Sequence, residues 1–155
     1  MNTTSTATVL ANATFTLTTG LLGAVTTNLT ATLLNGGTQV LIAGGRVASA
    51  AVATAYLYTI SSTAIATTGN LKTGRELHTA TLLGNNKVLI AGGTLASGAA
   101  IGYSELYDSA GLASSVTGSM TNARTQHAAM LMSDGEVLVV GGIAGTAGSI
   151  EAYQP

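Results

Sequence analysis

The chain has 155 residues, of which 46% are hydrophobic, so it is long enough to bury a core within one domain. Only 7% of the residues are charged, against roughly 25% in an average soluble domain. The net charge is −1 and the five basic residues are scattered, so no basic patch follows a phosphate backbone and nucleic acid is not an expected partner.

Cysteine is absent, which excludes disulfides and thiolate metal sites. Polarity is carried mainly by Thr, Ser and Asn, a composition more common outside cells, so we expect an extracellular or cell-surface protein. The N-terminus has no basic start and is not expected to be a signal peptide. No apolar run is long enough to predict a membrane-spanning helix. Three Asn-x-Thr sequons leave glycosylation open at Asn2, Asn12 and Asn28.

Short strands rich in Val, Leu, Ile and Thr are predicted along the whole chain, separated by Gly-containing turns. Asn35-Gly36 and Asp134-Gly135 are typical of tight hairpin corners. The Ala-rich and Gly-rich segments 46–53, 94–102 and 143–148 are interpreted as loops. In chain order, the predicted strands are 5–9, 13–19, 29–34, 39–43, 54–59, 63–68, 78–83, 87–91, 103–108, 112–117, 127–132, 136–140 and 149–153.

These strands follow an internal repeat. The stretch from Arg75 to Asp108, RELHTATLLGNNKVLIAGGTLASGAAIGYSELYD, reappears 49 residues later from Arg124 to Gln154. A more divergent copy runs from Thr26 to Thr59. A fixed period of this length indicates a repeat architecture, here with four short strands in each unit.

The repeated residues resemble a kelch repeat. The pattern is Arg-x-x-His, a strand, a turn, a second strand ending in Gly-Gly, and then Glu-x-Tyr. The second unit carries it as Arg75, His78, Gly92, Gly93, Glu105 and Tyr107, and the third as Arg124, His127, Gly141, Gly142, Glu151 and Tyr153. One departure is that the aromatic usual in the last strand survives only as Phe15.

The resemblance, to the bacterial or galactose-oxidase-like kelch type, implies an all-β protein made of β-propeller blades. Each blade would be a four-stranded antiparallel meander. The single repeat region 1–155 would hold a partial blade at 5–20, blades at 26–69 and 75–118, and a partial blade at 124–155. Because propellers have roughly four to eight blades, about three blades would not close a ring within one chain.

The repeated polar residues are interpreted as structural. The first unit has Thr26, Leu29 and Tyr56 where the other units have Arg, His and Glu, so all three are lost together. Joint loss predicts that they contact one another, within a blade or across a blade interface, because a buried Glu without its partner is disfavoured. The alternative is that His78 and His127 line a site as metal ligands or as a base, but no further ligand cluster is visible.

The glycine pairs are expected to allow positive φ and close backbone approach where strands end. Three tyrosines occupy the same position of the repeat: Tyr58, Tyr107 and Tyr153. They are expected to pack between blades, with their hydroxyls bound to backbone groups. Arg46, Tyr56 and Tyr103 are candidate binding residues, the two tyrosines for stacking on carbohydrate.

No catalytic constellation and no cofactor site is predicted, and we do not expect an enzyme. The leading hypothesis is a binding or scaffold module that associates with itself and contacts other proteins or extracellular matrix through its variable loops. Two chains would close a six-bladed ring, or chains would add head to tail in a filament or lattice. A fragment of a longer propeller and a propeller-based enzyme are the remaining alternatives; the copper chemistry of galactose oxidase would need a cysteine.

Overall fold

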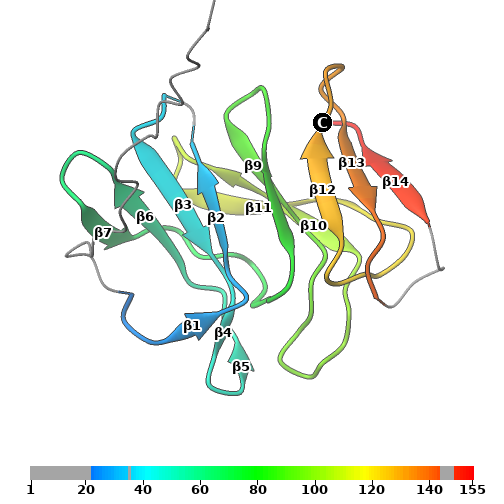
Figure 1. Cartoon of the computed structure of the whole chain (residues 1–155), viewed down its shortest axis with the longest axis horizontal. Coiled ribbons are helices and arrows are strands. Elements are labelled where there is room, and N and C mark those ends of the chain that lie inside the picture. Colours follow the sequence, from blue (N-terminus) through cyan, green and yellow to red (C-terminus); the bar gives the residue numbers. More distant parts are fainter. Residues whose placement is uncertain (1–21, 35, 144–148) are drawn as a thin grey trace, which may run out of the picture.

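The computed structural model describes residues 22–34, 36–143 and 149–155, so the strands predicted at 5–9 and 13–19 lie outside the described residues. Within these ranges the protein consists of strands and turns without a helix (Figure 1). The strands form four antiparallel sheets. This confirms the prediction of an all-β protein.

Two of the sheets are complete four-stranded meanders, one from each of the first two repeat units. In each, the chain passes from one strand to its hydrogen-bonded neighbour. The first sheet contains β2 (Thr30–Leu33), β3 (Gln39–Ala43), β6 (Ala55–Thr59) and β7 (Ala64–Thr67). The second sheet contains β8 (Thr79–Leu82), β9 (Lys87–Ala91), β10 (Tyr103–Asp108) and β11 (Ala113–Ser119).

The third sheet has three strands among the described residues: β12 (Ala128–Leu131), β13 (Val137–Val140) and β14 (Ile150–Tyr153).

In all three sheets, the strand bounds differ from the predicted ones by at most two residues. The largest difference is β11, which continues to Ser119 rather than ending at residue 117.

A small additional sheet was not expected from the sequence. It consists of β1 (Thr26–Thr27), β4 (Arg46–Val47) and β5 (Ala50–Ala51). Segment 46–53, interpreted above as a loop, therefore contains a short hairpin. Its corner residue Ala48 has a φ of 51°. Positive φ is uncommon for alanine, so the sequence did not indicate a turn there.

The first and second units differ by one residue in the hairpin between their first two strands. Five residues separate β2 from β3, whereas four separate β8 from β9. Equivalent positions in these two units are therefore 49 residues apart up to this turn and 48 apart just after it. The second and third units keep an offset of 49 through β13.

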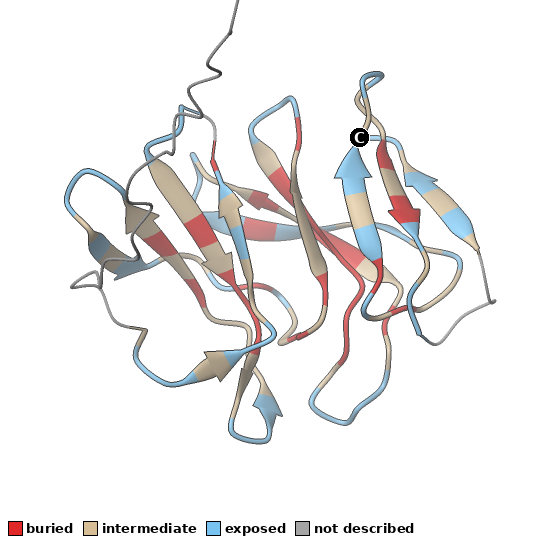
Figure 2. Ribbon diagram, viewed as in Figure 1, coloured by how far each residue is buried: buried red, intermediate tan, exposed pale blue. Residues whose placement is uncertain are grey.

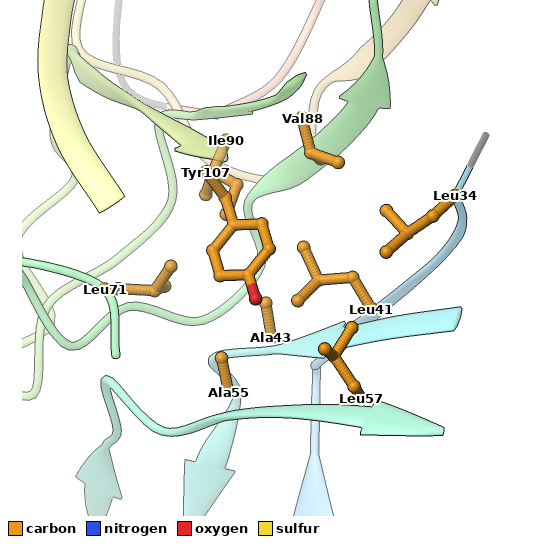
Figure 3. Close-up of a cluster of buried hydrophobic side chains, with 9 residues drawn as sticks. All are labelled: Leu34, Leu41, Ala43, Ala55, Leu57, Leu71, Val88, Ile90 and Tyr107. Atoms are coloured by element: carbon orange, nitrogen blue, oxygen red, sulfur yellow. The ribbon is translucent and has the colours of Figure 1, made fainter. Parts of the chain in front are cut away.

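The core lies between the sheets, which stack face to face. Leu41, Ala43, Ala55 and Leu57 of the first sheet pack against Val88, Ile90 and Tyr107 of the second, together with Leu34 and Leu71 (Figure 3). A second cluster joins Leu83, Leu89 and Ala91 to Val137 and Val139 of the third sheet. The first strands of the units lie side by side, with β8 next to both β2 and β12.

The central strand β9 is buried on both faces. Val88 and Ile90 belong to the cluster with the first sheet, and Leu89 and Ala91 to the cluster with the third. This explains the unbroken apolar run Val-Leu-Ile-Ala, since alternation is lost where both faces are covered. Each such Val, Leu or Ile stabilises the fold by about 1.5–3 kcal/mol relative to an exposed position.

Candidate functional site

The strongest polar feature is a buried ion pair in the second unit. Arg75 and Glu105 have fully buried side chains, and Nη2 of Arg75 lies 2.6 Å from Oε1 of Glu105. Nη1 of the arginine donates to the carbonyl oxygens of Gly92 and Tyr103, each at 3.0 Å. The guanidinium carbon also lies 5.3 Å from the centre of the Tyr103 ring, within range of a cation–π contact.

Glu105 is held by three further donors. The backbone N–H groups of Lys72 and Thr73 donate to its two oxygens at 2.6 and 3.1 Å, and the Ser114 hydroxyl donates at 2.6 Å. Lys72 and Thr73 lie in the connection from the first sheet to the second. The carboxylate thus joins this connection to strands β10 and β11, and no lone pair is left over for a ligand.

The third unit repeats this pair in a more open setting. Nη2 of Arg124 lies 2.6 Å from Oε1 of Glu151, whose side chain is 19% exposed. Burial alone would raise the pKa of Glu151, but the N–H groups of Thr121 and Asn122 and the Arg124 guanidinium hold it below its usual range. A cavity of about 300 Å³ next to Glu151 lies between the second and third sheets.

The histidines do not join these ion pairs, so the prediction of one Arg-His-Glu network is wrong in this part. Nε2 of His78 lies 2.9 Å from the Thr30 hydroxyl of the first sheet, and Nε2 of His127 lies 2.9 Å from the Thr79 hydroxyl of the second. Each histidine therefore binds the preceding sheet. The arginine binds within its own unit and the histidine binds the preceding sheet, and both contacts hold stacked units in place. The first unit has neither residue.

Both histidines are neutral near pH 7. Burial, together with the charge of Arg75 and of the other histidine, lowers the pKa of His78 to about 3. Burial and the charge of Arg124 lower the pKa of His127 to about 4, against a smaller raising effect of the Ala91 backbone. A general base that works near neutral pH needs a higher pKa and access to a substrate, and these buried side chains offer neither.

The glycine pairs are the points where one unit meets the next. Gly92 has a φ of 61°, and a Cβ there would lie 2.6 Å from the Arg124 carbonyl oxygen and 2.8 Å from Cε1 of His127. Gly93 donates its N–H to the same carbonyl at 2.9 Å. Gly44 and Gly45 make the matching contacts with Arg75. Gly141 and Gly142 also have positive φ.

The repeated tyrosines also connect neighbouring sheets. The Tyr107 hydroxyl lies 2.5 Å from the Thr68 hydroxyl, and the Tyr153 hydroxyl lies 2.9 Å from that of Thr117. Their partners are side chains, whereas backbone partners were expected. Tyr58, the equivalent in the first unit, is half-buried.

Arg46 lies in a polar cluster that sequence reasoning missed. Its Nε donates to Oε1 of Glu76 at 2.6 Å, and Nδ2 of Asn28 donates to the other oxygen at 2.8 Å. Glu76 is almost fully buried and its pKa is lowered, mainly by Arg46. The other units have Thr at the position of Glu76, so the repeat comparison gave no signal for this contact.

Tyr56 lines an apolar cavity of about 340 Å³ in the first unit, at the position where the second unit has Glu105. Tyr103, the other candidate for stacking, lies against Arg75. Arg46, Tyr56 and Tyr103 therefore lie in different environments and are not brought together into one site.

Among the described residues, no group of three His, Asp or Glu side chains could hold a metal ion. No helix within the described ranges is long and apolar enough to cross a membrane.

No family model matches the chain, and no curated protein matches it either.

Proposed function

We propose that this protein is a non-catalytic binding or scaffold module built of kelch-type β-propeller blades, acting outside the cell or at its surface and completed by self-association. The observation that carries the proposal is that the repeated polar residues are buried and bound within the protein. Arg75, Glu105 and His78 are buried and bind neighbouring backbone or the neighbouring sheet. These residues stabilise stacked units and are not presented to a substrate.

The sheet arrangement supports the blade interpretation. Two units are four-stranded meanders, and each stacks on the next through one glycine pair, one histidine and one tyrosine. Repeated four-stranded sheets are the units of which β-propellers are built. The third sheet lacks a fourth strand among the described residues. The sequence before Gly20 resembles the sequences before Gly69 and Gly118, which contain β7 and the first part of β11.

Self-association is supported by the third sheet, because β14 has a side to which no strand is paired among the described residues and a second chain can add there. The variable connections after each glycine pair would carry contacts with other proteins or matrix, because they differ between units more than the strands do. Two of them, 46–53 and 94–102, are described, and most of 143–148 lies outside the described residues.

The mass in solution tests this proposal. One chain has a mass of 15.2 kDa, and we expect sedimentation equilibrium to give the mass of two chains at micromolar concentration. A single-chain mass at every concentration would contradict self-association. Retention of the chain on immobilised matrix proteins, compared with a variant whose 94–102 segment is shortened, tests the binding role of the loops.

The second candidate is a structural subunit of an extracellular filament or lattice. It is favoured by the outer side of β14, which has no strand paired to it among the described residues. Unpaired strand edges join other chains readily. Ordered fibres in electron micrographs of purified protein would support this candidate, and discrete particles would contradict it.

A further inference from the structure

The third sheet presents an apolar face that no other sheet covers among the described residues. Cross-strand pairing places its side chains in two rows. Met130 and Ile150 are 60% and 62% exposed, and Val140 is 39% exposed. Figure 2 shows exposed stretches on β12 and β14. We call this surface the outer face of the third sheet; it consists of Ala128, Val140 and Ile150 in one row and Met130, Leu138 and Ala152 in the other.

The same face is covered in both preceding units. Leu41 and Ala43 of the first sheet pack under the second sheet, and Leu89 and Ala91 of the second pack under the third. All four are at most 1% exposed. Leu138 and Val140 occupy the equivalent positions of the third sheet. The chain therefore shows twice what covers this face, namely the opposite face of a following unit.

The first sheet carries such an opposite face. In the second and third sheets, the covering face includes Val88, Ile90 and Tyr107, or Val137, Val139 and Tyr153. The equivalent side chains of the first sheet share one face by their register; they are Ala31, Leu33, Val40, Ile42, Tyr56 and Tyr58. We call this surface the outer face of the first sheet. It has no charged residue, and Leu33 is 53% exposed.

The two outer faces are both apolar at the position where the internal interfaces have a polar Thr–His pair. Inside the chain, Thr30 meets His78 and Thr79 meets His127. At the outer faces, the position of the threonine is taken by Ala128 and the position of the histidine by Leu29. If Ala128 packed against a histidine, or Leu29 against a threonine, a buried polar group would lose its hydrogen-bond partner. If Ala128 packs against Leu29, no polar group is left without a partner.

We infer that the outer face of the third sheet binds the outer face of the first sheet of a second copy of this chain, head to tail. This inference rests on the self-association proposed above and names the surfaces that carry it. The contact reproduces the internal stacking and replaces its polar Thr–His pair by an apolar one. Such a heterologous contact closes a ring when its rotation allows, and otherwise continues into a filament.

Charged substitutions on exposed positions of the face test the inference. Met130→Glu and Ile150→Asp place a charge in an apolar contact without touching the buried core. Val116→Asp is the matched control, because Val116 is 68% exposed on β11, away from both outer faces. We expect both face variants to raise the dissociation constant of the dimer at least tenfold in sedimentation experiments, and the control to change it less than threefold. Unchanged circular dichroism establishes that the variants fold.

Cross-linking tests the head-to-tail orientation. Within the chain, Thr32 lies against the Ala80 carbonyl at 3.5 Å, and the equivalent positions on the outer faces are Met130 and Ala31. Because the chain has no cysteine, Met130→Cys and Ala31→Cys variants carry single reactive thiols. We expect a short bismaleimide to link the two variants when mixed and neither variant alone. Cross-linking of Met130→Cys with itself would indicate stacking of two third sheets and overturn the inference.

The outcomes separate this inference from the proposal on which it rests. Wild-type protein that stays at a single-chain mass overturns self-association and this interface together. Wild-type dimers that persist in both Met130→Glu and Ile150→Asp leave self-association standing and overturn only the assignment of the face. Equal weakening by Val116→Asp would show a general effect of charge and would also overturn the assignment.

Discussion

Glu105 is a fully buried carboxylate with four hydrogen-bond donors, and its substitution is the most direct test of the structural role of the repeat. Glu105→Gln removes the charge while keeping the size of the side chain. It leaves Arg75 as a buried charge without its counterion, so we expect the free energy of unfolding to fall by about 3 kcal/mol. Urea denaturation followed by circular dichroism measures this loss.

The control for this experiment is Glu136→Gln. Glu136 binds the side chain of Gln154 at an exposed position, so its substitution should change the free energy of unfolding by less than about 0.5 kcal/mol. If the two variants unfold at the same urea concentration, the Arg75–Glu105 pair does not stabilise the stacked units.

Acidification should weaken the fold through the two histidines. Their pKa values in the folded protein, about 3 for His78 and about 4 for His127, lie below the ordinary value of 6.5. Between these values the unfolded chain binds protons that the folded chain does not, so stability is lost as the pH falls below 6.5. From pH 7 to pH 5 we expect a loss of about 2 kcal/mol for each histidine.

Denaturation curves at several pH values test this dependence. The lowered pKa of Glu76 and that of Glu151 add losses only below about pH 4.5, so the range from pH 6.5 to 4.5 reports the histidines. A His78→Gln/His127→Gln variant, which keeps a polar group for each threonine, should show a flatter curve in this range. An equally steep curve in that variant would contradict the assignment.

At the residue scale, the sequence predicted contacts that recur and missed those that do not. The joint presence of Arg75 and Glu105 in one unit and their joint absence in another indicated that they interact. The same logic grouped His78 with them incorrectly, because co-occurrence does not distinguish contact within a unit from contact with the preceding one. The Arg46–Glu76 pair occurs once, so no comparison of units could reveal it.

At the scale of elements, the glycine pair after β9 offers a sharp test. Gly92→Ala would place a Cβ 2.6 Å from the Arg124 carbonyl oxygen at a φ of 61°, where a side chain is already disfavoured. We expect the free energy of unfolding to fall by at least about 2 kcal/mol, since both strain and a clash contribute.

The turn before β9 contains the matched control. A Cβ on Gly84 would have no neighbour within 4 Å, and Gly84 is not among the residues with positive φ. Gly84→Ala should therefore leave the urea midpoint nearly unchanged or raise it slightly. A loss in Gly84→Ala comparable with that in Gly92→Ala would indicate that the unit contact is not what makes Gly92 necessary.

Strand positions were predictable at this scale because short apolar runs between turn residues leave few alternatives. Gln39–Ala43 and Lys87–Ala91 were predicted with their observed bounds. The hairpin of β4 and β5 was missed because Arg46–Val47 and Ala50–Ala51 carry no strand-like pattern of their own. That hairpin is fixed by pairing with β1, in which Thr26 meets Val47 and Thr27 meets Arg46.

At the scale of the whole molecule, stability depends on stacking. Each unit buries an apolar face against its neighbour, as in other repeat proteins, so among the described residues the first and third sheets each pack against another sheet on one face. The sequence predicted the repeated strands, but not which faces of the first and third sheets have no sheet packed against them among the described residues. That follows only from the register, which assigns Leu138 and Val140 to the outer face and Val137 and Val139 to the core.

This dependence predicts that thermal stability rises with protein concentration. If a second copy covers the outer faces, binding stabilises the folded chain by mass action, so a hundredfold increase in concentration should raise the Tm by several degrees. Met130→Glu should have a lower Tm at high concentration and little dependence on concentration, whereas Val116→Asp should follow the wild type. Differential scanning calorimetry from micromolar to near-millimolar concentration makes the comparison. A wild-type Tm that does not change over this range would mean that the outer faces stay uncovered, and that the units within one chain supply all of its stability.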